Sequence, residues 1–286
     1  MDLRLLSHLR EGYHGQTQVA RVLTEDWVQR EAYCVACLER PLRRFPNNAK
    51  VWDFQCERCS EPYQLKARAS NFTTSVADGA YSTFYEAVVR GAAPNFLLMH
   101  YDRERLHVES LFGLHRRFIS PLSVIRRKPL SPSARRVGWV GCNLDLGAIP
   151  NGALIPIVRE GAISDAGMVQ AQWLRFAQLD SLDGHSGWVR DVLTCVQKIG
   201  GDTFRLKDVY SFESELSRIH PGNRNVQPKI RQQLQVLCRA GLVERVSPGV
   251  YHKGRLVRNF PVSPQGEFPV SGSPVPDSYD GKSNAP

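Results

Sequence analysis

Hydrophobic and polar positions divide most of the chain into short regular segments. Apolar residues at helical spacing predict helices over residues 16–31, 78–90 and 166–178. Strand patterns cover residues 51–55, 62–66, 95–101 and 154–158, and residues 105–112 are expected to pair with residues 95–101. Residues 120–141, rich in Arg, Pro and Ser, are expected to form a loop. This mixture predicts an α/β fold for the N-terminal part.

The pattern changes at Gly187. Helices are predicted over residues 188–199, 206–219 and 226–240, followed by a hairpin at residues 243–251 with Pro248 and Gly249 at its tip. Residues 179–186 have the composition of a linker. We therefore expect a first domain at residues 1–180 and a second at 187–256. Residues 257–286, rich in Pro, Ser and Gly, are expected to form a disordered tail.

Four of the seven cysteines form two CxxC pairs, Cys34 with Cys37 and Cys56 with Cys59, and 18 residues separate the pairs. This spacing is typical of a four-cysteine zinc site. Four thiolates complete a closed tetrahedron, so we expect a structural Zn²⁺. Cys142, Cys195 and Cys238 lack such spacing and are interpreted as core residues.

The net charge indicates a class of partner, and the apolar segments of the chain bear on its localisation. The formal net charge is +9, which favours a polyanionic partner because Lys and Arg neutralise phosphates. Charged residues interrupt the short apolar run at residues 1–12, and this argues against a signal peptide. No segment has the roughly 18 apolar residues that a membrane span requires. We expect a cytoplasmic protein.

A second group of polar residues lies between and after the zinc cysteines. Asp53 stands in one predicted strand, and Gln64 and Lys66 stand in the next, on one face because side chains alternate. The pattern resembles the PD-(D/E)xK nuclease core. That resemblance implies that Asp53 and Gln64 bind a catalytic Mg²⁺ and that Lys66 stabilises the attacking hydroxide or the developing phosphorane charge. Gln64 replaces the usual Asp or Glu, and Glu25, Asp26 or Glu61 are candidates to restore the missing carboxylate.

Longer stretches extend the resemblance over about residues 17–253. They are residues 20–28 (ARVLTEDWV), 71–72 (NF), 78–81 (DGAY), 125–130 (IRRKPL), 134–136 (ARR), 138–139 (GW), 141–143 (GCN) and 229–237 (KIRQQLQVL). Together with the zinc pairs and Asp53, they resemble the DpnI-like methyl-directed restriction endonucleases. The resemblance implies a PD-(D/E)xK restriction-endonuclease-like core with a zinc site, a C-terminal winged helix, and Mg²⁺-dependent cleavage of double-stranded DNA at GATC sites that carry N6-methyladenine.

Two segments are the expected readers of that DNA. The first is the loop with Arg126, Arg127, Lys128, Arg135 and Arg136, whose side chains suit phosphates and guanine edges. Trp139 in this loop can offer its indole face to the adenine methyl group, or it can be a half-buried core residue. The second is the helix at residues 226–240, where Lys229, Arg231, Gln232 and Gln235 face outward, while Ile230, Leu234 and Leu237 face the core. Asn225 is its expected N-cap, and Arg245 and Lys253 are expected to contact the DNA backbone.

Two other functions are compatible with the sequence. Gln64 favours a methyl-adenine binding protein whose cleavage is weakened or lost. A transcription regulator with a zinc ribbon and a winged helix would explain the cysteines and helices, but not the pairing of Asp53 with Lys66.

Overall fold

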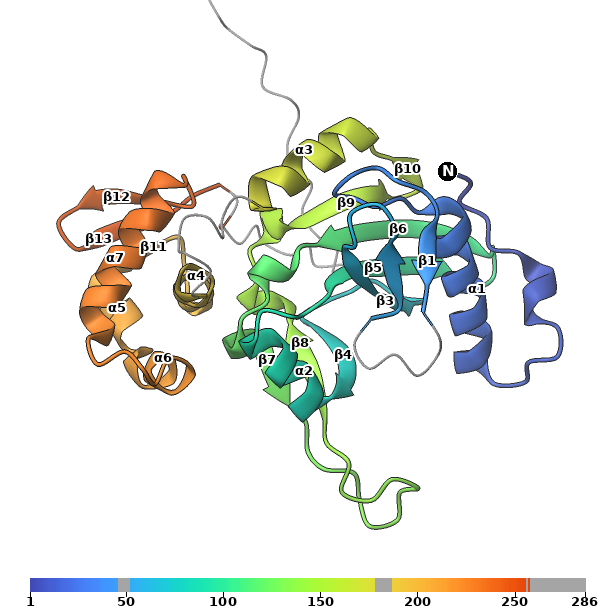
Figure 1. Cartoon of the computed structure of the whole chain (residues 1–286), viewed down its shortest axis with the longest axis horizontal. Helices are drawn as coiled ribbons and strands as arrows, with labels where there is room; N and C mark the ends of the chain where they lie inside the picture. The colour runs from blue at the N-terminus through green and yellow to red at the C-terminus, as the bar shows by residue number, and fades with distance from the viewer. Residues whose placement is uncertain (46–51, 178–186, 256, 258–286) are drawn as a thin grey trace, which may run out of the picture.

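The computed structural model describes residues 1–45, 52–177, 187–255 and 257 of the chain (Figure 1). The predicted α/β class is confirmed, with a mixed central sheet followed by a small helical domain. The linker predicted at residues 179–186 and residues 258–286 of the predicted tail lie outside the described residues. Val257, the first residue assigned to that tail, is instead completely buried in the hydrophobic core. None of the helices in the described ranges is long and apolar enough to cross a membrane.

A seven-stranded sheet forms the centre of the N-terminal part, in the order β1–β2–β3–β5–β6–β9–β10. The strands are β1 (Leu42–Arg44), β2 (Phe54–Cys56), β3 (Pro62–Arg68), β5 (Asn95–Asp102), β6 (His107–Leu114), β9 (Leu154–Arg159) and β10 (Ala162–Ile163). Only β3 and β5 are parallel among the pairs described, and β5 pairs with β6 as predicted. The strand predicted at residues 51–55 corresponds to β2, which begins at Phe54 and ends at Cys56.

Helices cover both faces of this sheet. Tyr63 in β3 is fully buried and contacts Trp173 of α3 (Ala166–Ala177), with ring centroids 6.3 Å apart. Gln64 points to the opposite face because side chains alternate along a strand. It is in register with Phe96 of β5, whose ring packs edge-on against Phe84 of α2 (Tyr81–Val89). Helix α3 therefore covers one face, and α2 covers the face of Gln64.

Helix α1 (Gln16–Glu31) has the predicted bounds and packs beside β1 and β3. Its Trp27 is completely buried and donates a hydrogen bond from Nε1 to the Asp2 carbonyl at 2.7 Å. The single-turn helices are η1 (Ser7–Arg10), η2 (Arg116–Phe118), η3 (Pro121–Ser123), η4 (Leu146–Ala148) and η5 (Asn151–Ala153).

A second sheet, β4–β8–β7, lies beside α2 and corrects two predictions. Its strands are β4 (Ser75–Ala80), β7 (Val124–Arg126) and β8 (Gly141–Asp145). The helix expected from residue 78 begins at Tyr81, because residues 75–80 pair with β8 instead. The predicted loop 120–141 also begins with η3 and β7. Both errors arise from pairing between distant segments, which local patterns do not reveal.

Within residues 187–255, the C-terminal part contains four helices and a three-stranded sheet in the order β11–β13–β12. The elements are α4 (Trp188–Lys198), β11 (Thr203–Arg205), α5 (Leu206–Tyr210), α6 (Glu213–Ile219), α7 (Val226–Arg239), β12 (Val243–Ser247) and β13 (Val250–Lys253). The single helix predicted at residues 206–219 is broken into α5 and α6, and β11 was not expected. The predicted helix at residues 226–240 and the hairpin are present.

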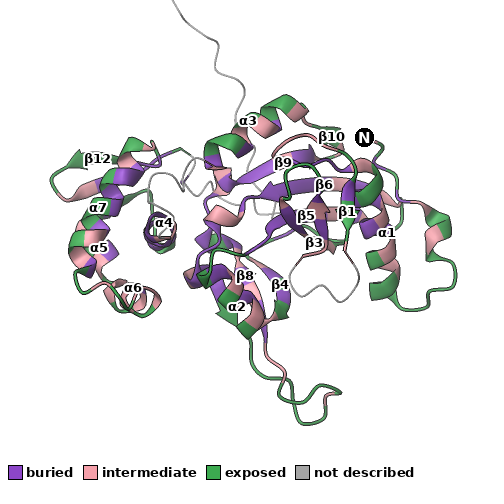
Figure 2. Ribbon diagram, in the orientation of Figure 1, coloured by how far each residue is buried: buried purple, intermediate pink, exposed green. Residues whose placement is uncertain are grey.

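Helix α4 lies between the two parts of the molecule and is buried on almost every side (Figure 2). Nine of its 11 residues are buried. It packs against α5 and α7 on one side and against η2, η3 and η4 of the N-terminal part on the other. Its Asp191, fully buried, accepts hydrogen bonds from Ser120 of the N-terminal part at 2.8 Å and from Arg190 at 2.9 Å. His220, which stacks on Trp188, is 2.8 Å from the second oxygen of Asp191.

Candidate functional site

The two CxxC pairs adopt the same backbone turn. In the first, the Leu38 N–H donates to the Cys34 carbonyl at 2.7 Å, and Leu38 has a positive φ of 62°. In the second, the Ser60 N–H donates to the Cys56 carbonyl at 2.9 Å, and Ser60 has a φ of 61°. Two equivalent turns therefore present their cysteines to a common point.

That common point has the dimensions of a zinc site. The four Sγ atoms, from Cys34, Cys37, Cys56 and Cys59, all lie within 4.8 Å of one another. The separations are 3.4 Å for Cys34–Cys59 and 3.5 Å for Cys37–Cys56. These distances exceed a disulfide bond of about 2.05 Å and suit thiolates that share one ion at about 2.3 Å. The cluster can therefore hold zinc, as the spacing predicted.

Tyr63 supports this cluster from β3. Its hydroxyl lies 3.2 Å from Cys34 Sγ and the side chain is completely buried. A hydroxyl donor beside a ligating sulfur orients it and stabilises its negative charge. Because Gln64 is the next residue, the cysteine cluster and the candidate nuclease residues share one strand.

Asp53, which immediately precedes β2, lies beside the part of β3 that carries Gln64 and Lys66. The Leu65 N–H donates to Asp53 Oδ2 at 2.8 Å, so the carboxylate lies against β3 between Gln64 and Lys66. Burial raises the pKa of Asp53, while the Leu65 N–H bond and the positive charge of Lys66 counteract this rise. A cation near Asp53 would stabilise its ionised form further.

A fourth residue that the sequence analysis did not assign, Asp78 of β4, completes this cluster. Its side chain is only 2% exposed, and its Oδ1 accepts hydrogen bonds from Lys66 Nζ at 2.6 Å and from Gln64 Nε2 at 3.1 Å. The Gly79 N–H donates to the same oxygen at 2.7 Å. Residues 78–81 belonged to the motifs that carried the family resemblance, and that was the available signal.

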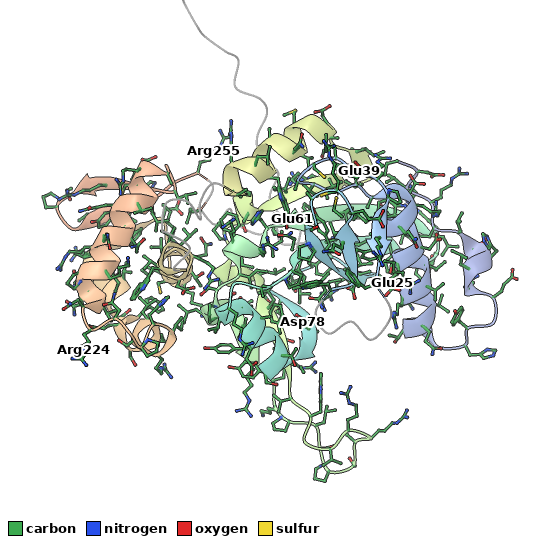
Figure 3. All side chains as sticks on the ribbon, in the orientation of Figure 1. Glu25, Glu39, Glu61, Asp78, Arg224 and Arg255 are labelled. Carbon is green, nitrogen blue, oxygen red and sulfur yellow. The ribbon has the colours of Figure 1, made fainter. Side chains whose placement is uncertain are left out.

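The three acids expected to compensate for Gln64 are held by other side chains, and two of them, Glu25 and Glu61, are labelled with Asp78 in Figure 3. Glu25 pairs with Arg21 and Arg44, although it lies close enough to Asp53 for its negative charge to add to the effect of burial in raising the pKa of Asp53. Asp26 pairs with Arg30, and Glu61 accepts hydrogen bonds from Asn95 and Arg116. No contact with Gln64 or Lys66 is found for these three among the described residues, so Asp78 is the acid that the fold brings to Gln64.

Two cavities open beside the cluster. The first, here called the α2 groove, has a volume of about 640 Å³ and is lined by Trp52, Gln64, Asp78, Thr83 and Glu86, among others. The second, the basic groove, has a volume of about 540 Å³ and includes Lys66, Arg68, Ser75, Arg127 and Asn143. Gln64 and Lys66, two residues apart on β3, thus face separate cavities, and one of them is lined by three cationic side chains.

Comparison with known families gives two matches. The model of the Dam-replacing family, DpnI, matches residues 1–181, and the model of the Dam-replacing HTH domain matches residues 184–253. The chain belongs to the Dam-replacing family. Membership confirms the resemblance inferred from the sequence and indicates a nuclease, and the HTH domain indicates DNA binding.

The loop between β7 and β8 extends away from the core of this Dam-replacing family member (Figure 1). Its backbone is paired, since Arg127 N–H donates to the Gly141 carbonyl at 3.0 Å and Leu130 N–H to the Trp139 carbonyl at 2.9 Å. The five basic residues expected to contact DNA are all exposed: Arg126, Arg127, Lys128, Arg135 and Arg136. The segment is a shaped hairpin that presents these cations to solvent.

Trp139 lies at the base of this hairpin and is half-buried. Its ring covers Gly141 so closely that a Cβ there would come within 2.8 Å of it, and the Arg136 guanidinium lies 5.1 Å from the ring centroid. The described hydrophobic core does not include Trp139. Gly141 pairs with Ala80 of β4, so the indole stands close to the strand that carries Asp78.

Helix α7 of the HTH domain has the predicted two faces. Ile230, Leu234 and Leu237 are buried. Arg231, Gln232 and Gln235 are exposed, and Lys229 is half-buried. Arg231 donates a hydrogen bond to the Tyr210 hydroxyl at 2.6 Å. Asn225 occupies the N-cap position, although its side chain makes no capping hydrogen bond.

One expected DNA contact in this domain is wrong. Lys253 is completely buried, and its Nζ donates to the Ile199 carbonyl at 2.6 Å, at the end of α4. A lysine there satisfies a terminal helix carbonyl, so its role is structural. Arg245, on the neighbouring strand β12, is exposed as expected.

Proposed function

We propose that the protein is a Mg²⁺-dependent type II restriction endonuclease that cleaves double-stranded DNA at GATC sites carrying N6-methyladenine. The observation that carries this proposal is that Gln64, Lys66 and Asp78 meet at the border of two grooves, while the Asp53 carboxylate is held against the backbone of β3 between Gln64 and Lys66. Membership in the Dam-replacing family supports the nuclease class, and the HTH domain supports DNA as the partner.

The donor atoms of the cluster fit a hard divalent cation. Gln64 Oε1 and Asp78 Oδ2 are buried without a hydrogen-bond partner in the described structure, and oxygen atoms are the ligands that Mg²⁺ prefers. Asp53 and Gln64 would hold the ion. When bound, Mg²⁺ supplies a polarised phosphate and a bound water of lowered pKa. Lys66 places a positive charge at the same edge, where it would stabilise the negative charge that develops during hydrolysis.

The basic groove would hold the DNA backbone beside the reacting phosphate. Lys66, Arg68 and Arg127 line it from β3 and from the base of the hairpin. Such contacts position a duplex without reading its sequence. The hairpin and the exposed face of α7 would read the bases, and the apolar face of Trp139 would contact the N6-methyl group. Each such apolar contact contributes on the order of 1 kcal/mol.

We also propose that the four cysteines hold a structural Zn²⁺. All ligand positions are then occupied by sulfur, which leaves no open position for catalysis. The site would fix the β2–β3 hairpin, because Asp53 lies three residues before Cys56 and Gln64 lies five residues after Cys59. Its function would therefore be to position the nuclease residues.

The test is incubation of adenine-methylated and unmethylated plasmid with the purified protein, with Mg²⁺ or with EDTA. The expected result is cleavage of methylated plasmid alone, and only with Mg²⁺. The Asp53→Ala variant should not cleave but should still bind a methylated GATC duplex, because the carboxylate serves the cation and not the bases. Undiminished cleavage by this variant would refute the assignment.

A methyl-adenine binding protein is the alternative. It is favoured by the uncharged Gln64 and by the 2.6 Å bond that ties Lys66 to Asp78. The same experiment separates the two functions. Absence of cleavage, together with tight and methylation-dependent binding of the duplex, would establish the binding protein.

A further inference from the structure

Asp78 is the buried carboxylate nearest to the uncharged position 64. We propose that Asp78 supplies the anionic cation ligand that Gln64 cannot provide, so that Asp78 and Asp53 together form the charged part of the catalytic cation site. The inference rests on the proposed nuclease function and deepens it. It assigns a ligand role to a residue outside the Asp53–Gln64–Lys66 pattern.

The two oxygens of Asp78 have different surroundings. Oδ1 accepts from Gln64 Nε2, Lys66 Nζ and the Gly79 N–H, so its hydrogen-bonding capacity is used. Oδ2 is buried and has no partner within the described residues. Buried acceptors normally find a donor or a cation, and a 2% exposed carboxylate side chain is an unusual place for an unpaired oxygen.

Gln64 adds a second unpaired oxygen beside it. An ionised carboxylate can only accept hydrogen bonds, so the amide must turn its Nε2 toward Asp78. Its Oε1 is consequently directed away from Asp78 Oδ1, and this atom too is buried without a described partner. Both side chains line the α2 groove. A cation that enters this groove would meet two oxygens that no donor satisfies.

The charge of the cluster supports the same conclusion. Asp53 and Lys66 alone would sum to zero, a poor basis for holding a divalent ion. With Asp78 the cluster carries two carboxylates and one ammonium group. A site with Asp53, Lys66 and an Asp or Glu at position 64, but without Asp78, would carry the same net charge.

The backbone holds Asp78 firmly in this place. In the register of β4 and β8, Asp78 is opposite Cys142, and Val76 is opposite Leu144. Val76, Cys142 and Leu144 are buried. The carboxylate is therefore part of a packed sheet, so a ligand there would be ordered before the cation binds, as a precise metal site requires.

The test measures cation binding separately from cleavage. Isothermal titration calorimetry would follow Ca²⁺ binding to the full chain in complex with a methylated GATC duplex. The variants are Asp78→Asn, Gln64→Glu, their combination, and the control Glu86→Gln. Glu86 is a suitable control because it lines the same α2 groove, but its side chain is 64% exposed and pairs with Arg90.

Asp78→Asn should weaken Ca²⁺ binding at least tenfold, because the site loses one of two negative charges. Gln64→Glu should strengthen binding and should restore it in the double variant. Glu86→Gln should bind Ca²⁺ within about twofold of the unaltered protein, as expected for an exposed charge. A thermal melt of each variant checks that it is folded.

Unchanged Ca²⁺ affinity in a folded Asp78→Asn variant would overturn the inference. So would a Gln64→Glu variant with no gain in affinity, and this second variant keeps the test decisive if Asp78→Asn does not fold. The proposed function is tested independently by plasmid cleavage with the unaltered chain. If that chain cleaves methylated DNA and Asp78→Asn cleaves equally well at every Mg²⁺ concentration, the endonuclease assignment stands and the role of Asp78 is refuted.

Discussion

Replacing Asp191 with asparagine is expected to lower the free energy of unfolding by about 3 kcal/mol, because breaking a buried charge network leaves the partner groups uncompensated. Asp191 is fully buried and accepts hydrogen bonds from Ser120 and Arg190, with His220 beside it. Asparagine has the same shape but no charge, so Arg190, 17% exposed, loses its ionic partner. The substituted amide retains part of the hydrogen bonding, which places the cost at the lower end of the range.

The assay is urea denaturation, followed by circular dichroism, with a calorimetric melt as a second measurement. A loss of this size corresponds to a fall in Tm of about 6–12 °C for a protein of this size. Asp26→Asn is the matched control, since Asp26 also pairs with an arginine, Arg30, but both side chains are about 30% exposed. An exposed pair contributes less than about 1 kcal/mol. If Asp191→Asn costs no more than Asp26→Asn, the reasoning is refuted.

The same substitution has a consequence for acid stability. Burial alone would raise the pKa of Asp191, but Arg190, His220 and Ser120 overcome this effect and lower it below the ordinary value of 3.8. A carboxyl group with a lowered folded pKa contributes stability that is complete above its unfolded pKa and is lost as the pH falls through its folded pKa. The difference in stability between the unaltered chain and Asp191→Asn should therefore be constant near pH 7 and shrink below pH 3.8. A difference that persists unchanged at low pH would contradict the charge argument.

Three further predictions concern metal and DNA. Cys59→Ser should contain much less zinc than the unaltered chain, as elemental analysis measures, and should melt at a lower temperature. The reason is that the binding energy of a structural zinc, on the order of 10 kcal/mol, stabilises the fold. Cys238→Ser, outside the cluster, should retain the metal. Arg127→Gln should reduce the slope of log affinity against log salt by about 0.9 for methylated and unmethylated duplexes alike, and an unchanged slope would exclude a phosphate contact. Trp139→Ala should lower the ratio of methylated to unmethylated binding, which competition assays measure; a constant ratio would mean that the ring only packs on Gly141.

The sequence allowed correct prediction of features that depend on local pattern. The bounds of α1, the buried face of α7 at Ile230 and Leu234, and the pairing of β5 with β6 follow from periodicity and order along the chain. The cysteine cluster followed from spacing, because two CxxC turns can meet at one ion wherever the chain brings them together.

Features that depend on distant pairing could not be read in this way. The apolar residues after Asp78 have helical spacing and predict a helix there, whereas β8, more than 60 residues away, recruits Asp78 into a strand. An isolated lysine such as Lys253 normally lies at the protein surface. Its burial depends on the end of α4, whose carbonyl group it satisfies. Asp191 has no local signal, since its partners Ser120 and His220 come from separate parts of the sequence.

The burial of α4 also bears on how this protein can be divided. The family models part between residues 181 and 184, yet the helix that begins at Trp188 packs against η2, η3 and η4 as well as α5 and α7. A C-terminal fragment beginning at residue 184 would expose apolar side chains of α4 to water. In the complementary N-terminal fragment, η3 and η4 would no longer be covered by α4. The boundary between the two family matches therefore does not coincide with a boundary in packing, and exchanging HTH domains between relatives would require the surface that receives α4 to be exchanged with them.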